Sequence, residues 1–365
     1  MQDPWQEFIL SRFDVAPGKL RRRTQKWFWV WDWVSSEVKK IMRHCFILFL
    51  LLAVSVSRTC AVDAAERTGP VRIGVLTEGF GPTSGAVGLR DGLKALGYRE
   101  DKDFVIGVRF TQGDVSALPA AAMELVQRGA VILFTDGRNP AKAAKMETAK
   151  VPIVFAGGGD PVGFGLIQSF ARPGGNITGV SDLDLELGPK RLEIFKEMIP
   201  GLKRVLFPYS ATDAYSVSEA KAYRDAARHL QIVLVEKAVR TEDEAKTVLT
   251  KLKKGDIQGI LSPRPMTSNI PGYVRDAGSE SSMPTMFAAT FFAENGGLAS
   301  YTPHTYESGR MAARLVDKIL KGESPAVIPV EVNQKIELVI NLKVAKALAI
   351  NIAPEALYKA NRVIR

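Results

Sequence analysis

Three consecutive glycines, Gly157 to Gly159, are the residues whose type and spacing point most clearly to binding chemistry. They follow a short apolar run, Ile153 to Phe155, which is typical of a strand buried on both faces. The pair Asp160-Pro161 is a good N-cap and first helical residue, so the glycines form a loop between a strand and a helix N-terminus. Glycine lets such a loop expose N–H groups of partial positive charge to a ligand. The alternative is that these positions are glycine only because the backbone needs a positive φ.

The residues on which most enzyme sites depend are scarce in this chain. There are three histidines and two cysteines, and both cysteines, Cys45 and Cys60, lie in the N-terminal part. Zinc sites, thiolate catalysis and disulfides are therefore not expected in the rest of the chain. Ser84 stands where the third glycine of a dinucleotide fingerprint belongs, and the segment 81–85, GPTSG, is not a nucleophile elbow. We predict that the protein is not an enzyme and has no catalytic residue, metal or cofactor.

Strands and helices alternate regularly after Val71. Strands are expected at 71–76, 104–110, 130–136, 153–155, 204–209, 231–239, 257–263 and 284–289. Helices are expected at 85–96, 116–128, 139–150, 188–198, 216–230, 241–253 and 268–279, with an amphipathic helix at 306–321. The remaining segments 298–303 and 331–341 are expected to be extended. This alternation predicts parallel sheets covered by helices on both faces, in two α/β units that join near Ile177 to Ser181.

Several long motifs resemble one known family. The stretch from Val151 to Leu183 carries the signature PIVF…DPVG.GL..S.ARPGGNITG of the ABC-transporter substrate-binding proteins. Further motifs follow in the same order: GPKRLEIFKEMIPGLKRV (188–205), GGLASYTP (296–303), ARLVDKILKGESPAVIPVE (313–331) and KIELVINLKVAKAL (335–348). The resemblance runs from about Val71 to the C-terminus. It implies a periplasmic-binding-protein-like fold of type I, in which two α/β, Rossmann-like lobes with parallel sheets hold a small solute between them.

The resemblance also implies three passages of the chain between the lobes, near Thr178, Ser300 and Ala326, which form a hinge with a defined axis. The expected domains are an N-terminal extension with a signal peptide (1–64), a first lobe (65–178, completed by about 300–325) and a second lobe (179–299, completed by about 326–365).

By the same resemblance, the solute lies against the loops at the C-terminal ends of the strands. The candidate ligand-binding residues of the first lobe are Thr77, Glu78, Gly79, Phe80, Thr135, Asp136, Gly137, Gly157, Gly158 and Asp160. Those of the second lobe are Tyr209, Ser210, Pro263, Arg264 and Phe287. Their hydroxyls, N–H groups, charges and rings suit an amino-acid-like or small carboxylate solute.

Each of these residues also has a structural interpretation. Glu78 and Asp136 are either partners of an amine or ordinary loop acids, and Asp160 is better explained as a helix N-cap. Arg264 either pairs with a carboxylate of the solute or lies at the surface. The rings of Phe80, Tyr209, Phe287 and Phe291 either stack on a solute or pack in a core.

The N-terminal region has the features of an export signal. Met42 and Arg43 precede the apolar run from Cys45 to Ser57, so Met42 is the expected start of a secretory signal. Cleavage is expected before Ala65. Arg58 and Thr59 do not fit a lipobox, so lipid anchoring at Cys60 is not expected.

Together these features predict an exported, periplasmic solute-binding protein. The expected partners are a small-molecule solute and an ABC permease with its ATPase at the inner membrane, and the protein is expected to be a monomer. The net charge of +10 comes without a basic run, so no nucleic-acid partner is expected. Two alternatives use the same fold: a cytoplasmic ligand-sensing regulator and a sensor ectodomain.

Overall fold

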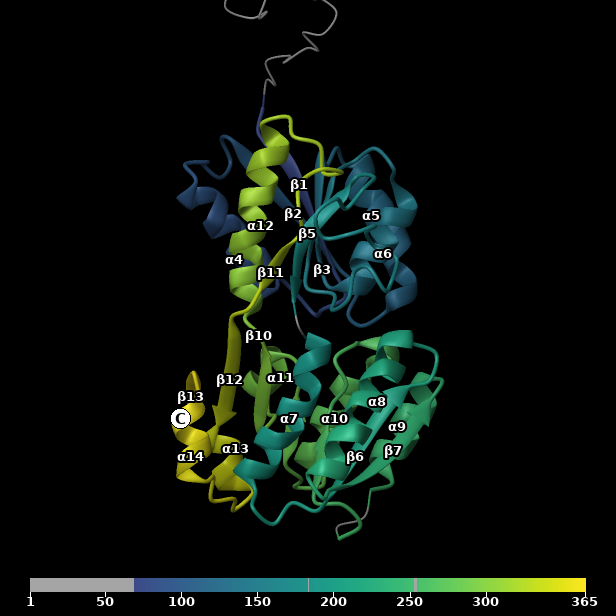
Figure 1. Ribbon diagram of the computed structural model, residues 1–365, viewed down its shortest axis with the longest axis vertical. Helices are drawn as coiled ribbons and strands as arrows, with labels where there is room; N and C mark the ends of the chain where they lie inside the picture. The colour runs from purple at the N-terminus through teal and green to yellow at the C-terminus, as the bar shows by residue number, and fades with distance from the viewer. Residues whose placement is uncertain (1–68, 183, 253–254) are drawn as a thin grey trace, which may run out of the picture. The chain divides into compact units, whose positions relative to one another are not determined.

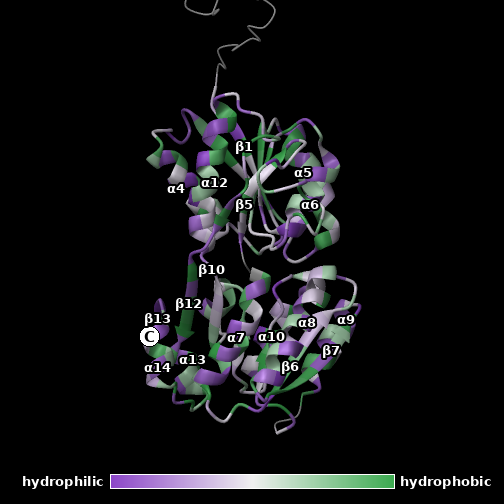
Figure 2. Cartoon of the chain, in the orientation of Figure 1, coloured by the Kyte–Doolittle hydropathy of each residue, from purple (hydrophilic) through white to green (hydrophobic). Residues whose placement is uncertain are grey.

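The computed structural model describes residues 69–182, 184–252 and 255–365 (Figure 1). They form two sheets with helices packed on them, which confirms the predicted α/β fold with two lobes. The expected signal peptide, its start at Met42 and its cleavage before Ala65 lie outside the described residues. In Figure 2 hydrophobic residues concentrate along strands such as β1 (Val71–Thr77) and β12 (Ile336–Asn341), while the helices alternate between hydrophobic and hydrophilic residues.

The first lobe is built on a six-stranded sheet in the order β11-β5-β4-β3-β1-β2, in which every neighbouring pair is parallel. Its other strands are β2 (Phe104–Phe110), β3 (Ile132–Asp136), β4 (Ile153–Ala156), β5 (Ile177–Asp182) and β11 (Glu331–Asn333). Its helices are α4 (Ser84–Ala95), α5 (Leu118–Gln127), which follows the short 3-10 turn Val115–Ala117, α6 (Arg138–Glu147) and α12 (Thr305–Leu320). The parallel pairing places the C-terminal ends of β1, β3, β4 and β5 at one edge of the sheet, where their loops meet.

The second lobe is built on a seven-stranded sheet in the order β13-β12-β10-β9-β8-β6-β7. Its other strands are β6 (Arg204–Ser210), β7 (Val233–Val239), β8 (Gly259–Leu261), β9 (Thr285–Phe287), β10 (Ala299–Pro303) and β13 (Arg362–Ile364). Its helices are α7 (Asp184–Met198), α8 (Ala214–His229), α9 (Glu242–Thr250), α10 (Ile270–Glu280), after the 3-10 turn Thr267–Asn269, α11 (Thr290–Glu294), α13 (Leu342–Ala347) and α14 (Pro354–Lys359). Only the pair β10–β12 is antiparallel.

Helix α12 belongs to the first lobe although it follows a strand of the second. Glycines allow its backbone to approach helix α4 closely, because a Cβ on Gly88 would lie 2.0 Å from the carbonyl oxygen of Tyr306. A Cβ on Gly309 would lie equally close, 2.0 Å, to the carbonyl oxygen of Gly85. The buried face of α12, including Leu315 and Val316, joins the apolar core beneath β1. This packing fixes one end of the connection between the two sheets.

The chain passes between the sheets at three places: between Asp182 and Asp184, between Pro303 and Thr305, and between Asn333 and Ile336. These places lie beyond the expected ones at Thr178, Ser300 and Ala326. Each strand continues past its apolar run with polar residues that are nevertheless buried, such as Asp182 and Asn333, which are each 3% exposed.

The helix predicted to begin at Asp160-Pro161 is absent, and residues 161–165 form turns instead. The Asp160 carboxylate does accept hydrogen bonds from the N–H groups of Val162 (3.2 Å) and Gly163 (2.9 Å), as an N-cap would. Gly165 then adopts a positive φ of 72°. This left-handed residue ends the turn before a second helical turn can form.

Candidate functional site

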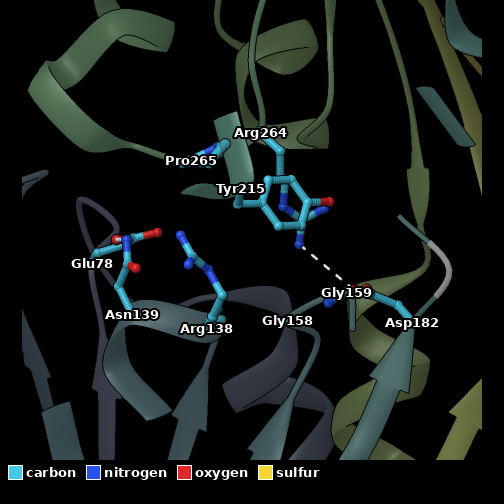
Figure 3. Close-up of a pocket in the computed structure, with 10 residues that line it drawn as sticks. Glu78, Arg138, Asn139, Gly158, Gly159, Asp182, Tyr215, Arg264 and Pro265 are labelled. Atoms are coloured by element: carbon cyan, nitrogen blue, oxygen red, sulfur yellow. Dashed lines mark hydrogen bonds and ion pairs between the residues drawn. The ribbon is translucent and has the colours of Figure 1, made fainter. Parts of the chain in front are cut away.

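A small cavity lies where the loops of the two lobes meet, and we call it the polar cavity. The first lobe contributes Glu78, Gly137, Arg138, Asn139, Gly158, Gly159 and Asp182, and the second contributes Tyr215, Arg264 and Pro265 (Figure 3). Its volume is about 40 Å³. Most of its side chains are charged or can form hydrogen bonds, so the cavity suits the polar end of a small molecule.

A larger cavity of about 350 Å³, which we call the ring cavity, adjoins it. Glu78, Gly137 and Arg264 line both cavities. The rings of Phe80 from the first lobe and Phe291 from the second stack at a centroid distance of 6.1 Å and an interplanar angle of 11°. Both lie in the wall of the ring cavity and remain 43% and 44% exposed. The ring cavity thus offers aromatic surface next to the polar cavity.

Arg264 holds the centre of the site. Its Nη1 donates to the carbonyl oxygen of Ala288 and to Oγ1 of Thr302, both at 3.1 Å. Its Nη2 lies 3.9 Å from Oδ2 of Asp182, an ion pair between the lobes that Figure 3 marks. The other oxygen of Asp182 accepts the N–H of Gly159 at 3.1 Å. The guanidinium is therefore held at a fixed place between the two cavities.

The surroundings of two acidic side chains in the first lobe raise their pKa values. Burial raises the pKa of Glu78, although a hydrogen bond from Asn139 (2.9 Å) and the charge of Arg138 partly oppose the shift. Burial likewise raises the pKa of Asp136 in the ring cavity, where the Thr83 hydroxyl partly opposes it. A carboxyl group whose charged form is disfavoured in this way gains stabilisation when a cationic group arrives beside it.

Eight of the predicted site residues line one or both cavities: Thr77, Glu78, Gly79, Phe80, Asp136, Gly137, Gly158 and Arg264. The other seven do not, and they are Thr135, Gly157, Asp160, Tyr209, Ser210, Pro263 and Phe287.

Packing or local hydrogen bonding accounts for most of these seven. Phe287 is fully buried in the core of the second lobe, and the ring of Tyr209 stacks on Phe207 at 5.7 Å. Ser210 is buried and its hydroxyl hydrogen-bonds to Thr212, while the exposed Asp160 serves its own turn. For the rings of Phe287 and Tyr209 the structure thus favours packing over contact with a solute.

The loop of Gly157, Gly158 and Gly159 needs glycine for its backbone conformation, and two of its residues also line the polar cavity. Gly157, Gly158 and Gly159 have φ values of 79°, 105° and 67°, which favour glycine. The N–H of Gly157 donates to Val180 and that of Gly159 to Asp182, so the protein itself uses these two donors. Gly158 and Gly159 line the polar cavity.

Five residues of the polar cavity were not among the candidates from the sequence, and they are Arg138, Asn139, Asp182, Tyr215 and Pro265. Asp182 is the last residue of β5. Arg138 and Asn139 begin α6, and Tyr215 lies in the first turn of α8. Extending each loop into the first turn of the next helix would have found these last three.

Within 69–182, 184–252 and 255–365, no group of three or more His, Cys, Asp or Glu side chains is placed to hold a metal ion. The same ranges contain no helix that is long and apolar enough to span a membrane.

A family model described as "ABC transporter substrate binding protein" matches residues 71–364. The chain belongs to this family. Members of the ABC transporter substrate-binding family are solute-binding proteins, and the two lobes with a cavity between them agree with that role.

Two similar proteins carry names that describe a ligand. A "Tyrosine-binding protein" of Clostridioides difficile (strain R20291) is 27% identical over 261 residues, which cover 70% of this chain and 74% of that protein. The ABC domain from Streptococcus pneumonia, solved in complex with L-Trp, is 27% identical with a TM-score of 0.69, over 81% of this chain and 100% of that one. A conserved domain protein from Vibrio cholerae is 28% identical with a TM-score of 0.71, over 80% and 99% of the two chains.

Proposed function

We propose that this chain is the exported solute-binding component of an ABC-type uptake transporter, and that its solute is an amino acid with an aromatic side chain. One observation supports this most directly: a polar cavity with both acidic and guanidinium groups adjoins a ring cavity lined by Phe80 and Phe291. Amino acids of this kind carry a zwitterion and a ring in the same close relation. The named relatives, a tyrosine-binding protein and a domain solved with L-Trp, agree with this class.

The polar cavity would hold the zwitterion. Glu78, whose pKa burial raises, and Asp182 provide carboxylates for an ammonium group. Arg138, Arg264 and the loop at Gly158 provide positive charge for a carboxylate. Hydrogen bonds to charged groups are worth about 1.5–3 kcal/mol each, so both ends of the zwitterion contribute to affinity.

The ring cavity would hold the side chain. Its volume of about 350 Å³ lies in the range of about 300–1,000 Å³ that is usual for small-molecule sites. Phe80 and Phe291 come from different lobes, so a ring lying against both of them brings the lobes together. Aromatic pairs add about 0.5–1.5 kcal/mol beyond the burial of their area.

The two sheets and their helices would move as two lobes about the three passages that follow Asp182, Pro303 and Asn333. Solute contacts from both lobes then shift the balance toward the closed form, which a permease and its ATPase recognise. Export by a signal that starts at Met42 and is cleaved before Ala65 completes the proposal, with the protein acting as a monomer.

A thermal-shift screen tests this function on the purified protein. L-Tyrosine, L-tryptophan and L-phenylalanine should raise the melting temperature, whereas arabinose and succinate should not. A ligand at 100 times its Kd adds about 2.7 kcal/mol to the free energy of unfolding, which such a screen detects easily. A response to the sugar or the dicarboxylate, with none to the aromatic amino acids, would reject the proposed solute class.

A further inference from the structure

An ion pair at the rim of the polar cavity joins the two lobes. Arg138 begins α6 in the first lobe, and Asp213 is the N-cap residue of α8 in the second. Nη2 of Arg138 donates to Oδ2 of Asp213 at 2.6 Å, and the two side chains are only 13% and 10% exposed. Ion pairs that are shielded from water in this way interact much more strongly than exposed ones.

The carboxylate of Asp213 is oriented independently of the contact between the lobes, because it also caps the N-terminus of its own helix, α8. Its Oδ1 accepts the N–H of Ser216 at 2.8 Å, which caps α8, and this leaves Oδ2 directed at Arg138. Asp213 itself lines neither the polar nor the ring cavity, whereas Arg138 lines the polar cavity. Asp213 therefore does not touch a solute in either cavity, and its direct contact with the lining of the polar cavity is the one with Arg138.

Two rings, again one from each lobe, surround the same guanidinium. The Cζ atom of Arg138 lies 4.8 Å from the ring centroid of Phe164 and 5.5 Å from that of Tyr215. The two rings themselves are 5.8 Å apart. Cation–π contacts of this kind hold a guanidinium in place through its flat face, while the carboxylate binds its edge.

Gly159 lets the Tyr215 ring come this close. A Cβ at position 159 would lie 2.7 Å from Cε2 of Tyr215, nearer than side-chain packing permits. The approach of α8 to the glycine loop, the ring contacts and the ion pair therefore form together when the lobes meet.

From these contacts we infer that Asp213 is a positioning residue of the solute site, which acts through Arg138 and stabilises the closed arrangement of the lobes whatever the solute is. Together with the rings of Phe164 and Tyr215 it completes the guanidinium site only when the two lobes are in contact. The expected change in Kd rests on the proposed function, whereas the expected change in the distance between the lobes does not depend on the identity of the solute.

The substitution Asp213→Asn tests this role with little change to the helix, because asparagine caps helices about as well as aspartate. Asp225→Asn is the matched control. It lies on the same helix, and its carboxylate pairs with Arg228 in a contact where the side chains are 52% and 70% exposed. We expect Asp213→Asn to raise the Kd for L-tyrosine and L-tryptophan about 10- to 100-fold. Both solutes should lose affinity by the same factor, mainly through faster dissociation, whereas Asp225→Asn should bind like the wild type.

A second measurement follows the lobes directly. The only native cysteines are Cys45 and Cys60, and both are replaced by serine in the full chain. Spin labels at Met123→Cys and Val233→Cys then report one distance between the lobes. Both positions are exposed, and one lies in each lobe. Asp213→Asn should move the distance distribution to longer values, and Asp225→Asn should leave it unchanged.

The results separate the two proposals. If wild-type protein binds no aromatic amino acid but Asp213→Asn still lengthens the lobe distance, the proposed solute is wrong and the lobe contact stands. An unchanged Kd with an unchanged distance would overturn the role of Asp213. A gain in affinity would overturn it too, because it would mean that Asp213 competes with the solute for Arg138.

Discussion

Two arginine–carboxylate pairs of similar chemistry occupy different places in this protein, one within a lobe and one between the lobes. Arg191 and Glu219 lie inside the second lobe, where their side chains are 0% and 1% exposed and Nη1 is 3.4 Å from Oε1. Arg138 and Asp213 join the two lobes at 2.6 Å. Under the proposed movement of the lobes, a buried pair within one lobe belongs to the scaffold in every state, whereas a pair between lobes forms only when the lobes are in contact.

The pair within the lobe also supports the site. Arg191 donates to the hydroxyl of Tyr223 and, through Nε, to the carbonyl oxygen of Tyr301 at 2.9 Å. Oε2 of Glu219 accepts the backbone N–H of Arg264 at 3.1 Å. This network therefore anchors the loop from which the Arg264 side chain reaches both cavities.

The largest effect is expected at the buried pair. Glu219→Ala removes a buried carboxylate beside the buried Arg191 charge and should lower the free energy of unfolding by about 3–5 kcal/mol. Asp213→Asn should lower the free energy of unfolding by less than about 1 kcal/mol, because separation of the lobes lets water reach Arg138 without unfolding either lobe. Urea denaturation of both variants measures the contrast. Equal losses in the two would show that the pairs are not different in kind.

A smaller effect is expected where the lobes approach most closely. Gly159→Ala should weaken the binding of L-tyrosine about tenfold or more, because its Cβ meets Tyr215 of the other lobe. Gly175→Ala is the control: its φ of 65° matches the 67° of Gly159, but no atom lies within 4 Å of its Cβ position. Both should lose about 1 kcal/mol of stability from backbone strain. If calorimetry shows the same loss of affinity in both variants, the contact between lobes is not the cause.

Glu78→Gln should separate binding from stability. Since burial raises the pKa of Glu78, the folded state takes up its proton more readily than the unfolded chain. Glu78 thus favours folding at low pH, and this advantage is lost as the pH rises through its folded-state pKa. The variant should accordingly melt higher than the wild type at pH 7 and about equally at pH 4. It should also bind L-tyrosine about tenfold more weakly. A lower melting temperature at pH 7 would show that the charged form is stabilised by the protein alone.

The smallest effect is expected at the exposed pair of Asp225 and Arg228 on α8. Asp225→Asn should change the free energy of unfolding by no more than about 0.5 kcal/mol, because side chains this exposed gain little from pairing. Raising the salt concentration should not alter the difference measurably. A loss comparable to that of Glu219→Ala would mean that exposure does not govern the value of these pairs.

Much of the fold follows from local patterns in the sequence. The strands β1 to β4 are apolar runs that end at turn residues. Gly97 and Gly129, with φ values of 96° and 83°, follow the ends of helices α4 and α5. Short elements escaped prediction, among them α11, α13, α14 and β13. Helices of five or six residues show too few turns to display a period, and their existence depends on tertiary contacts.

The site could be predicted in part only. Glu78 directly follows β1, Asp136 ends β3 and Arg264 lies in the loop after β8, which is where a parallel sheet presents its loops. Phe287 could not be told from a ligand contact, because the sequence does not say which face of β9 turns toward the core. Asp213 and Tyr215 contact residues of the other lobe that lie more than 50 positions away in the chain, and no local sequence pattern predicts such contacts.

The central claim is that one solute places its zwitterion in the polar cavity and its ring in the ring cavity. Calorimetric titration with L-tyrosine, tyramine and 3-(4-hydroxyphenyl)propionate tests it most directly, since the two analogues lack the carboxylate and the amine respectively. We predict that L-tyrosine binds, and that the affinity for each analogue is lower by about 100-fold or more. The reason is that a charged group of the polar cavity is left without its partner. Binding of either analogue as tight as that of L-tyrosine, or no binding of L-tyrosine, L-tryptophan or L-phenylalanine, would contradict the claim.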